Sequence, residues 1–291
     1  MIRVLSTSEF AKALGVSESS VRRLADSGDL DIHRTRGGHR RIPVPDAVRY
    51  VRETGAKLLR PELLGLAEVP EAVDVATAKQ QMLTVFREGH AASVISLVQS
   101  LYASGMSIAE LCDGPISHAM ASIGETWPHD QRAIFIEHRA VVLCARALTQ
   151  LHGSLGDPDP DAPDAIGGAM SGDPYLLPTL MASLVVHGLG FNDINLGPNI
   201  PLDVLADSVI DEKPKLLWLA VSEPIRSKTR IRELLHLART ARDENTEFII
   251  GGRHAPSPDE HTIDGGAAWT RCDSMQSFDL KASEILASHL S

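Results

Sequence analysis

The stretch LSTSEFAKALGVSESSVRRLADSGDL, residues 5–30, reads as two short helices joined by a tight turn. Gly15 and Val16 supply the turn. Ser17 can cap the second helix, because its hydroxyl can accept a hydrogen bond from an N-terminal backbone amide. Apolar residues recur at helical spacing and predict a buried face on both helices, formed by Phe10, Ala13, Leu14, Val21 and Leu24. This is the spacing of a helix-turn-helix, whose second helix enters the major groove of DNA.

Arginines gather on the second helix and in the segment after it. The candidate groove-facing side chains are Ser19, Ser20, Arg22 and Arg23. The next segment, DIHRTRGGHRRIPV at residues 31–44, alternates around Gly37-Gly38 and predicts a hairpin. Its candidate phosphate-binding side chains are Arg34, Arg36, His39, Arg40 and Arg41. A plain helical hairpin needs no such basic wing, so we expect binding to double-stranded DNA.

Charge is distributed unevenly along the 291 residues. Residues 1–60 hold 12 Lys and Arg against 7 Asp and Glu, a net charge of +5. The remaining residues hold 16 against 31, a net charge of −15, which gives the chain its formal charge of −10. A basic head on an acidic body favours contact between the head and a polyanion that the body repels.

Composition argues against several other classes of protein. No apolar run reaches the length of a membrane span. The first residues lack the basic and apolar regions of a signal peptide, so we expect a cytoplasmic protein. Cys112, Cys144 and Cys272 are far apart and fit neither a disulfide framework nor a metal site, so we expect buried thiols. No hydrolytic or redox constellation is visible, and we expect neither catalytic residues nor enzymatic activity.

The chain is expected to hold three domains, at residues 1–58, 73–153 and 165–291. Four helical segments in the second domain, separated by Gly or Pro, predict a four-helix bundle. Strands alternate with helices in the third domain, which predicts a doubly wound parallel sheet. The expected strands are residues 165–170, 191–197, 215–221, 247–252 and 267–272. The expected helices are residues 175–188, 202–212, 227–243, 257–263 and 275–290.

Ligands of doubly wound sheets bind outside the carboxyl ends of the strands. The loops expected there are residues 171–174, 197–201, 222–224 and 251–252. Gly251-Gly252 can admit a ligand against bare backbone, although a tight turn explains the pair equally well. His254 and His261 also occur nearby with Asp259 and Glu260, in and beside the segment PSPDEH at residues 256–261. We interpret that segment as an exposed helix start rather than as a metal site.

A histidine and a glutamate interrupt the apolar pattern of the last bundle helix. His138 follows Glu137 and shares a helical stripe with Ile134, Val141 and other apolar residues. Trp127 precedes this helix, directly before the helix-breaking Pro128. Two interpretations are open: a core histidine hydrogen-bonded to a neighbour, or a face that lines a ligand site.

Two family resemblances bear on this choice. Residues 1–55, with the wing sequence GGHRR, resemble the winged-helix head of MerR-type transcription regulators. The order of head, bundle and doubly wound domain resembles the CarH-type, cobalamin-binding, light-responsive repressors, with IGETW at 123–127 and Glu137-His138 as the bundle signature. The resemblance implies a homo-oligomeric regulator that binds cobalamin or another tetrapyrrole, such as a bilin or haem. It implies ligand contacts from Trp127, His129, Glu137, His138, Asp173, Tyr175, Gly197, Ser222, Gly251 and Gly252.

The sequence departs from that family at both axial positions of the cobalt. The family loop Asp-x-His-x-x-Gly is replaced by residues that include Asp173, Tyr175 and Pro178. A phenol is a poor substitute for a neutral imidazole as a metal ligand, and the proline ring takes space that the family's glycine leaves for the nucleotide tail. Light-responsive members commonly place a histidine directly after the tryptophan, whereas here His129 lies one residue further on.

Three functions from different classes therefore remain. The favoured one is a DNA-binding regulator whose sensor holds cobalamin without the histidine ligand, or holds another tetrapyrrole. The second is a regulator whose sensor domain is empty and serves self-association or a protein partner. The third, a corrinoid carrier for methyl transfer, is disfavoured because such a carrier needs the missing histidine and has no use for a basic head.

Overall fold

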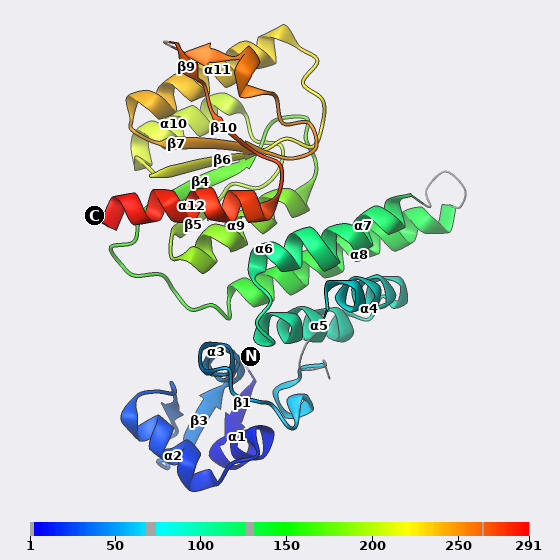
Figure 1. Ribbon diagram of the computed structural model, residues 1–291, viewed down its shortest axis with the longest axis vertical. Coiled ribbons are helices and arrows are strands. Elements are labelled where there is room, and N and C mark those ends of the chain that lie inside the picture. The colour runs from blue at the N-terminus through cyan, green and yellow to red at the C-terminus, as the bar shows by residue number, and fades with distance from the viewer. Residues whose placement is uncertain (1–2, 68–73, 126–130, 264, 291) are drawn as a thin grey trace. The chain divides into compact units, whose positions relative to one another are not determined.

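The computed structural model describes residues 3–67, 74–125, 131–263 and 265–290. The chain divides into two compact units, Met1–Gly156 and Asp157–Ser291. Figure 1 shows the head and a set of helices in the first unit, and the large sheet with its helices in the second. Among the described residues, no helix is both long and apolar enough to cross a membrane.

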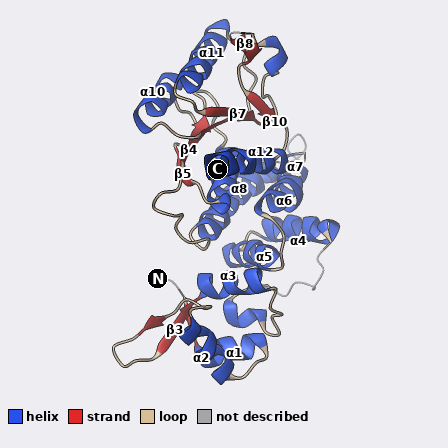
Figure 2. Ribbon diagram, turned by 60° about the vertical axis from the view of Figure 1, so that its left-hand side comes forward, coloured by secondary structure: helices blue, strands red, loops and turns tan. Residues whose placement is uncertain are grey.

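The head is a winged helix-turn-helix (Figure 2). Its elements are β1 (Val4–Ser6), α1 (Thr7–Leu14), α2 (Glu18–Ser27), β2 (His33–Arg34), β3 (Arg40–Pro43), α3 (Val44–Thr54) and the 3-10 turn η1 (Pro61–Leu64). The three strands form an antiparallel sheet in the order β1-β3-β2. The predicted buried face is confirmed, because Phe10, Ala13 and Val21 are each 0% exposed and Leu24 packs against the same core.

Gly15 forms the turn between α1 and α2 for two reasons. Its φ of 69° lies in the left-handed region, which side chains other than glycine disfavour. A Cβ at this position would also overlap the Leu59 side chain. The turn that the sequence predicts is therefore also the point where the segment after α3 packs back onto the head.

The second part of the first unit is the predicted helical bundle. Its helices are α4 (Val75–Glu88), α5 (Ala91–Ala103), α6 (Ile108–Leu111), α7 (Ser117–Gly124) and α8 (Gln131–His152). A π-helical turn, Cys112–Ile116, joins α6 to α7, so the third predicted segment is continuous but locally widened. Pro115 lies within this turn, and proline has no backbone N–H for a regular helical hydrogen bond.

The core of the head extends onto the bundle. Leu64, Leu66 and Ala103 belong to the same hydrophobic cluster as the helix-turn-helix residues. Arg52 of α3 stacks 3.9 Å from the centre of the Tyr102 ring. It also donates hydrogen bonds to the carbonyl oxygens of Tyr102 (2.5 Å) and Met106 (2.9 Å). Arg52 thus satisfies carbonyl groups at the C-terminal end of α5, where a cation is favourable.

The second unit confirms the predicted doubly wound parallel sheet. Its main elements are β4 (Asp164–Ala169), α9 (Leu176–Leu189), β5 (Asn192–Asn195), α10 (Leu202–Glu212), β6 (Leu216–Ala220), α11 (Lys228–Asp243), β7 (Glu247–Gly251), β10 (Thr270–Cys272) and α12 (Met275–Leu290). The five strands are parallel in the order β10-β7-β6-β4-β5. Helices α9 and α12 cover one face, and α10 and α11 cover the other (Figure 1).

Alternation along β6 sends side chains to both faces of this sheet. Leu217 and Leu219 pack into the hydrophobic cluster that contains buried residues of α10 and α11. Trp218 points to the face covered by α9, where its Nε1 donates to Thr179 Oγ1 at 3.2 Å. A Cβ on Gly167 of the neighbouring β4 would overlap the Trp218 ring, so this strand carries glycine where the indole lies.

One sequence prediction in this unit is wrong, and one strand is shorter than predicted. The helix predicted over 257–263 is a short 3-10 turn, Pro258–Glu260, followed by a hairpin of β8 (Thr262–Ile263) and β9 (Gly266–Ala267). The strand predicted over 267–272 joins the main sheet only from Thr270. The physical reason is tertiary: Arg242 of α11 donates to the carbonyl oxygens of Ile263 (2.6 Å) and Ala267 (3.1 Å) and holds the hairpin.

Candidate functional site

The exposed face of α2 begins at its N-terminal cap. Ser17 accepts a hydrogen bond from the backbone nitrogen of Ser20 at 3.2 Å, as a cap should. Ser19, Arg22 and Arg23 are exposed, whereas Ser20 is half-buried. The Ser20 hydroxyl lies 2.8 Å from that of Ser17, so it takes part in the cap.

The wing is the hairpin of β2 and β3. The Thr35 backbone nitrogen donates to the His39 carbonyl at 3.0 Å, and Gly38 adopts a φ of 76° at the tip. Arg34, Arg36 and His39 are exposed, and Arg40 and Arg41 are half-buried. The head therefore carries the predicted arginines on one helix and on one adjoining hairpin.

Carboxylates lie among these arginines. Glu18 Oε1 is 2.7 Å from Arg22 Nη2. Asp26 Oδ1 is 2.6 Å from Arg40 Nη2 and 3.4 Å from Arg34 Nη2. The hydrogen bond from Arg40 is the largest cause of a lowered pKa at Asp26, which is therefore a charged partner at neutral pH. Asp26 is not among the functional residues predicted from the sequence, although its spacing of seven residues from Ser19 places it on the same helical face.

In the second unit, a buried carboxylate lies at the carboxyl edge of the sheet. Asp173 is 1% exposed. Its Oδ2 accepts a hydrogen bond from the Ser222 backbone nitrogen at 2.5 Å, and its Oδ1 accepts one from the Tyr175 nitrogen at 3.2 Å. The residue that matches the family's aspartate thus links the loop after β4 to the loop after β6.

The loop after β5 packs on the loop after β4. The Ser171 nitrogen donates to the Ile200 carbonyl at 2.8 Å, and the Gly172 nitrogen donates to Asn199 Oδ1 at 2.7 Å. A Cβ on Gly168 would lie 2.7 Å from the Gly197 carbonyl oxygen, so the two backbones approach closely. Three of the four predicted ligand loops therefore form one connected surface.

The fourth loop contains the two glycines after β7. Gly252 has a φ of 110°, and a Cβ there would lie 2.5 Å from the Val221 carbonyl oxygen. The close approach that Gly252 permits is thus to the backbone of the loop after β6. Gly251 is half-buried beside it. Ser222, also half-buried, is tied to this group through Asp173.

Tyr175 directly precedes α9, and Pro178 lies in the first turn of that helix. Tyr175, the N-cap residue of α9, is 49% exposed. Pro178 is half-buried in the first turn, where proline is tolerated because its missing N–H would be unpaired there. The phenol therefore lies at the carboxyl edge of the sheet, at the start of α9.

The predicted bundle residues lie in the first unit, on α8. His138 is exposed, so the interpretation as a core histidine is wrong. Glu137 is half-buried, and its Oε2 is buried with no hydrogen-bond partner among the described residues. Trp127 and His129 lie outside the described residues. An unpaired buried carboxylate oxygen calls for an explanation, and a polar group supplied from outside the protein is one.

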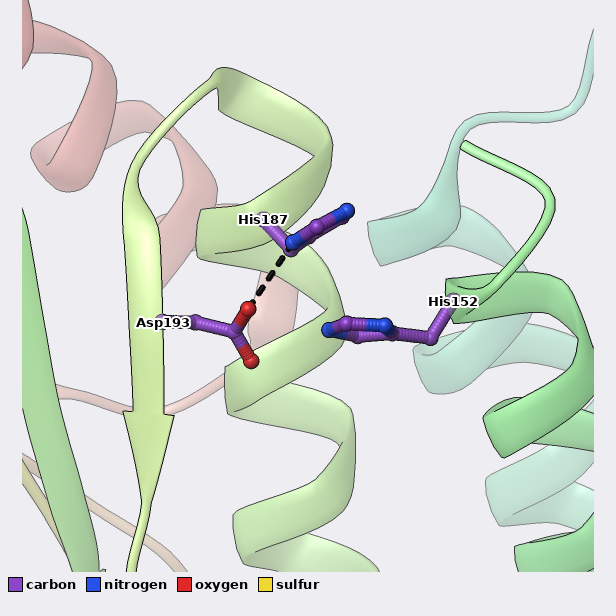
Figure 3. A group of neighbouring side chains, drawn as sticks. All are labelled: His152, His187 and Asp193. Atoms are coloured by element: carbon purple, nitrogen blue, oxygen red, sulfur yellow. Dashed lines mark hydrogen bonds and ion pairs between the residues drawn. The ribbon is translucent and has the colours of Figure 1, made fainter. Parts of the chain in front are cut away.

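Two further groups of polar or reactive side chains are buried. In the second unit, His187 Nδ1 of α9 lies 2.8 Å from Asp193 Oδ1 of β5 (Figure 3). The Ser183 hydroxyl donates to the other carboxylate oxygen. The three cysteines are free and buried, as predicted. Burial raises the pKa of the Cys144 thiol to about 12 and that of Cys112 well above its ordinary value. These thiols are packing residues and not nucleophiles.

Comparison with known proteins identifies the head and the fold of the remainder. A family model described as a helix-turn-helix domain matches residues 4–53. No curated protein matches the sequence. The monomethylamine corrinoid protein of Methanosarcina barkeri superposes with a TM-score of 0.53 at 16% identity, covering 73% of this chain and 100% of its own. This likeness shows a shared fold.

Two more solved structures were found at lower structural similarity. A cobalamin-binding protein from Desulfitobacterium hafniense has a TM-score of 0.37 at 16% identity, covering 74% of this chain and 99% of its own. The methanol:cobalamin methyltransferase complex of Methanosarcina barkeri has a TM-score of 0.36 at 16% identity, with coverage of 81% and 88%. The family match to the head and the elements of the structure show a chain that combines a helix-turn-helix head with a bundle and a doubly wound domain.

Proposed function

We propose that the chain is a DNA-binding transcription regulator of the MerR type whose second unit senses a tetrapyrrole. The observation that supports DNA binding is the set of exposed arginines on α2 and on the wing. Arg22 and Arg23 lie on the helix that enters the major groove in helix-turn-helix proteins. Arg36 lies on the exposed wing, where a guanidinium can pair with a backbone phosphate.

A corrinoid is the first candidate for the ligand. The shared fold with a corrinoid protein and the signature residues Glu137 and His138 support it. The unpaired Oε2 of Glu137 and the exposed imidazole of His138 supply hydrogen-bonding groups for the polar edge of such a ring. Resemblance to light-responsive repressors extends the proposal to a light response, and a bilin or haem remains a second ligand class.

The loop after β4 does not fit a corrinoid held by an axial histidine. Tyr175 stands in place of that histidine, and both carboxylate oxygens of Asp173 already accept backbone hydrogen bonds. On the face of the sheet that α9 covers, the Trp218 ring lies against Gly167. Trp218 is 2% exposed, so its ring already fills the space beside that glycine. We therefore propose that a tetrapyrrole is held without an axial ligand from this loop.

A regulator with an empty second unit is the alternative function. The observation that favours it is the same Asp173 bridge, which joins two loops at the edge where ligands of such sheets bind. In that case the second unit serves self-association or a protein partner. We propose no enzymatic role, because the methyl-carrier alternative needs the histidine that Tyr175 replaces.

Specific recognition also implies more than one copy of the chain. A single helix-turn-helix reads one half-site, and operators usually match a symmetric dimer or larger oligomer. We propose that residues 73–291 carry the self-association, because no heptad pattern follows the head. Light scattering of the full chain, with and without cobalamin, tests this, and a monomer under both conditions contradicts it.

Visible absorption tests the proposal that the chain binds a tetrapyrrole. The full chain is titrated with cobalamin, haem and a bilin, and each bound ring is detected by its shifted absorption bands after gel filtration. Co-elution of one ring supports the sensor, and loss of co-elution in His138→Ala places that ring near α8. Co-elution of none supports the empty unit instead.

A further inference from the structure

Asp26 is an exposed acidic side chain on the face of α2 that carries Arg22 and Arg23. Ser19, Arg22, Arg23 and Asp26 are spaced at i, i+3, i+4 and i+7, which places them on one side of a helix. All four are exposed. A carboxylate on a face that approaches DNA costs binding free energy, because it repels the phosphates that the arginines attract.

Asp26 holds both strands of the wing. Its Oδ1 lies 2.6 Å from Arg40 Nη2 on β3 and 3.4 Å from Arg34 Nη2 on β2. The Arg40 side chain is 23% exposed, compared with 51% for Asp26 and 56% for Arg34. The closer of the two pairs is thus also the more shielded from solvent, where an ion pair is screened least.

A carboxylate and a phosphate present similar oxygen acceptors to a guanidinium group. Asp26 therefore occupies, in the free protein, a place that a DNA phosphate would take beside Arg40. Binding of any duplex must either separate Asp26 from the arginines or bring a phosphate up to an arginine that is already neutralised. Either way the cost is the same for every DNA sequence, since phosphates carry no sequence information.

We propose that Asp26 lowers the affinity of the head for every duplex, random DNA included, by occupying arginines of the wing. It withholds Arg34 and Arg40 of the wing from phosphates and leaves Arg23 on α2 for base edges. A cost that is equal for all sequences leaves the ratio of specific to non-specific affinity unchanged, but it lowers the fraction of the chain that random DNA holds. This inference rests on the proposed DNA-binding function.

The test compares the full chain with its Asp26→Asn variant on a random-sequence duplex. Asparagine keeps an oxygen acceptor for Arg40 and removes the charge. Fluorescence anisotropy is measured between about 0.05 and 0.3 M salt, the range over which phosphate contacts are resolved. One additional phosphate contact steepens the slope of log K against log salt by about 0.9, which at about 0.15 M salt is a roughly fivefold gain in affinity.

The matched control is Glu53→Gln, which makes the same change in net charge on an exposed residue of α3. It should leave affinity for random DNA unchanged within about twofold, since surface charges far from a contact are screened. Asp26→Glu, which keeps the charge, should bind random DNA like the original chain and guards against a folding defect in Asp26→Asn.

Four outcomes separate the possibilities. A uniform gain of affinity with a steeper slope in Asp26→Asn supports the inference. Unchanged or weaker binding to random DNA overturns it, and so does a loss confined to one base pair of a selected site, because Asp26 would then read a base such as cytosine. If the original chain binds no duplex even at low salt, the proposed function itself has failed.

Discussion

The Oδ2 atom of Asp173 lies 2.5 Å from the backbone nitrogen of Ser222, and this contact joins the loop after β4 to the loop after β6. The two strands are neighbours in the sheet although β5 lies between them in the sequence. The winding of the sheet therefore changes direction here, and ligands of doubly wound sheets bind at such a point. In this chain a buried carboxylate bridges the two loops.

This relationship predicts that Asp173 stabilises the second unit. Replacing it with Ala leaves the Ser222 and Tyr175 nitrogens without their acceptor. The free energy of unfolding should fall by about 3 kcal/mol, because hydrogen bonds to a charged group are lost at a buried position. Urea unfolding measures the change. The control Asp207→Ala, on an exposed residue of α10, should cost less than about 0.5 kcal/mol, and an equal effect of both changes refutes the structural role.

A second prediction concerns position 175, where the cobalamin-binding repressors that this chain resembles carry a cobalt-binding histidine. Tyr175→His together with Pro178→Gly introduces the side chains that those repressors have in this loop. Because Tyr175 is 49% exposed at the carboxyl edge of the sheet, an imidazole there is accessible to a ring. Cobalamin affinity should rise at least about tenfold, a gain of roughly 1.4 kcal/mol, with the absorption spectrum of a histidine-ligated corrinoid. Tyr175→Phe with Pro178→Gly is the control, and equal affinity of the two double variants contradicts the prediction.

The features that the sequence predicts well are local ones. Caps, periodicity and turn glycines place α1, α2 and the wing, because each depends on residues a few positions apart. Strand and helix alternation likewise predicts the doubly wound sheet. The contact of Asp26 with the wing depends on how a helix packs against a hairpin. The hairpin held by Arg242 replaces a predicted helix, because long-range hydrogen bonds outweigh local propensity there.

The candidate site was predictable as a set of loops and not as a set of contacts. The loops after β4, β5, β6 and β7 meet at one edge because the strands are parallel. That Asp173 would be buried against Ser222 depends on strand order, which the sequence does not express. The sequence also does not reveal that His138 is exposed, because its apolar neighbours at helical spacing predict a buried stripe.

Close packing in β4 gives a third prediction. Gly167→Ala places a methyl group against the ring and the carbonyl oxygen of Trp218, so the strand or the indole must move. Overpacking of this kind costs about 1–3 kcal/mol, measured as a lowered melting temperature. Gly266→Ala is the control, since its nearest neighbour is an arginine side-chain atom at 3.6 Å. Adding Trp218→Leu to Gly167→Ala should recover part of the loss, and strictly additive effects refute the contact.

Replacing an arginine on α2 and replacing one on the wing should change DNA binding in different ways. Arg36→Ala removes a phosphate contact on the wing, so it should weaken binding to all sequences alike and reduce the salt slope by about 0.9. Arg23→Ala removes a groove-facing side chain and should instead relax preference at one base pair, by about 1–3 kcal/mol. Binding to a selected duplex and to its single-base variants measures both. The same pattern from both variants contradicts the separate roles of helix and wing.

The central claim is that one chain links DNA binding to a ligand of its second unit. The most direct test is the affinity of the full chain for a duplex obtained by in vitro selection, measured by anisotropy with and without each tetrapyrrole. We expect salt-dependent binding, with an affinity that one tetrapyrrole changes by at least about fivefold, the lower range of typical allosteric coupling. Absence of binding to every duplex at low salt, or an affinity that no tetrapyrrole alters, would contradict the account.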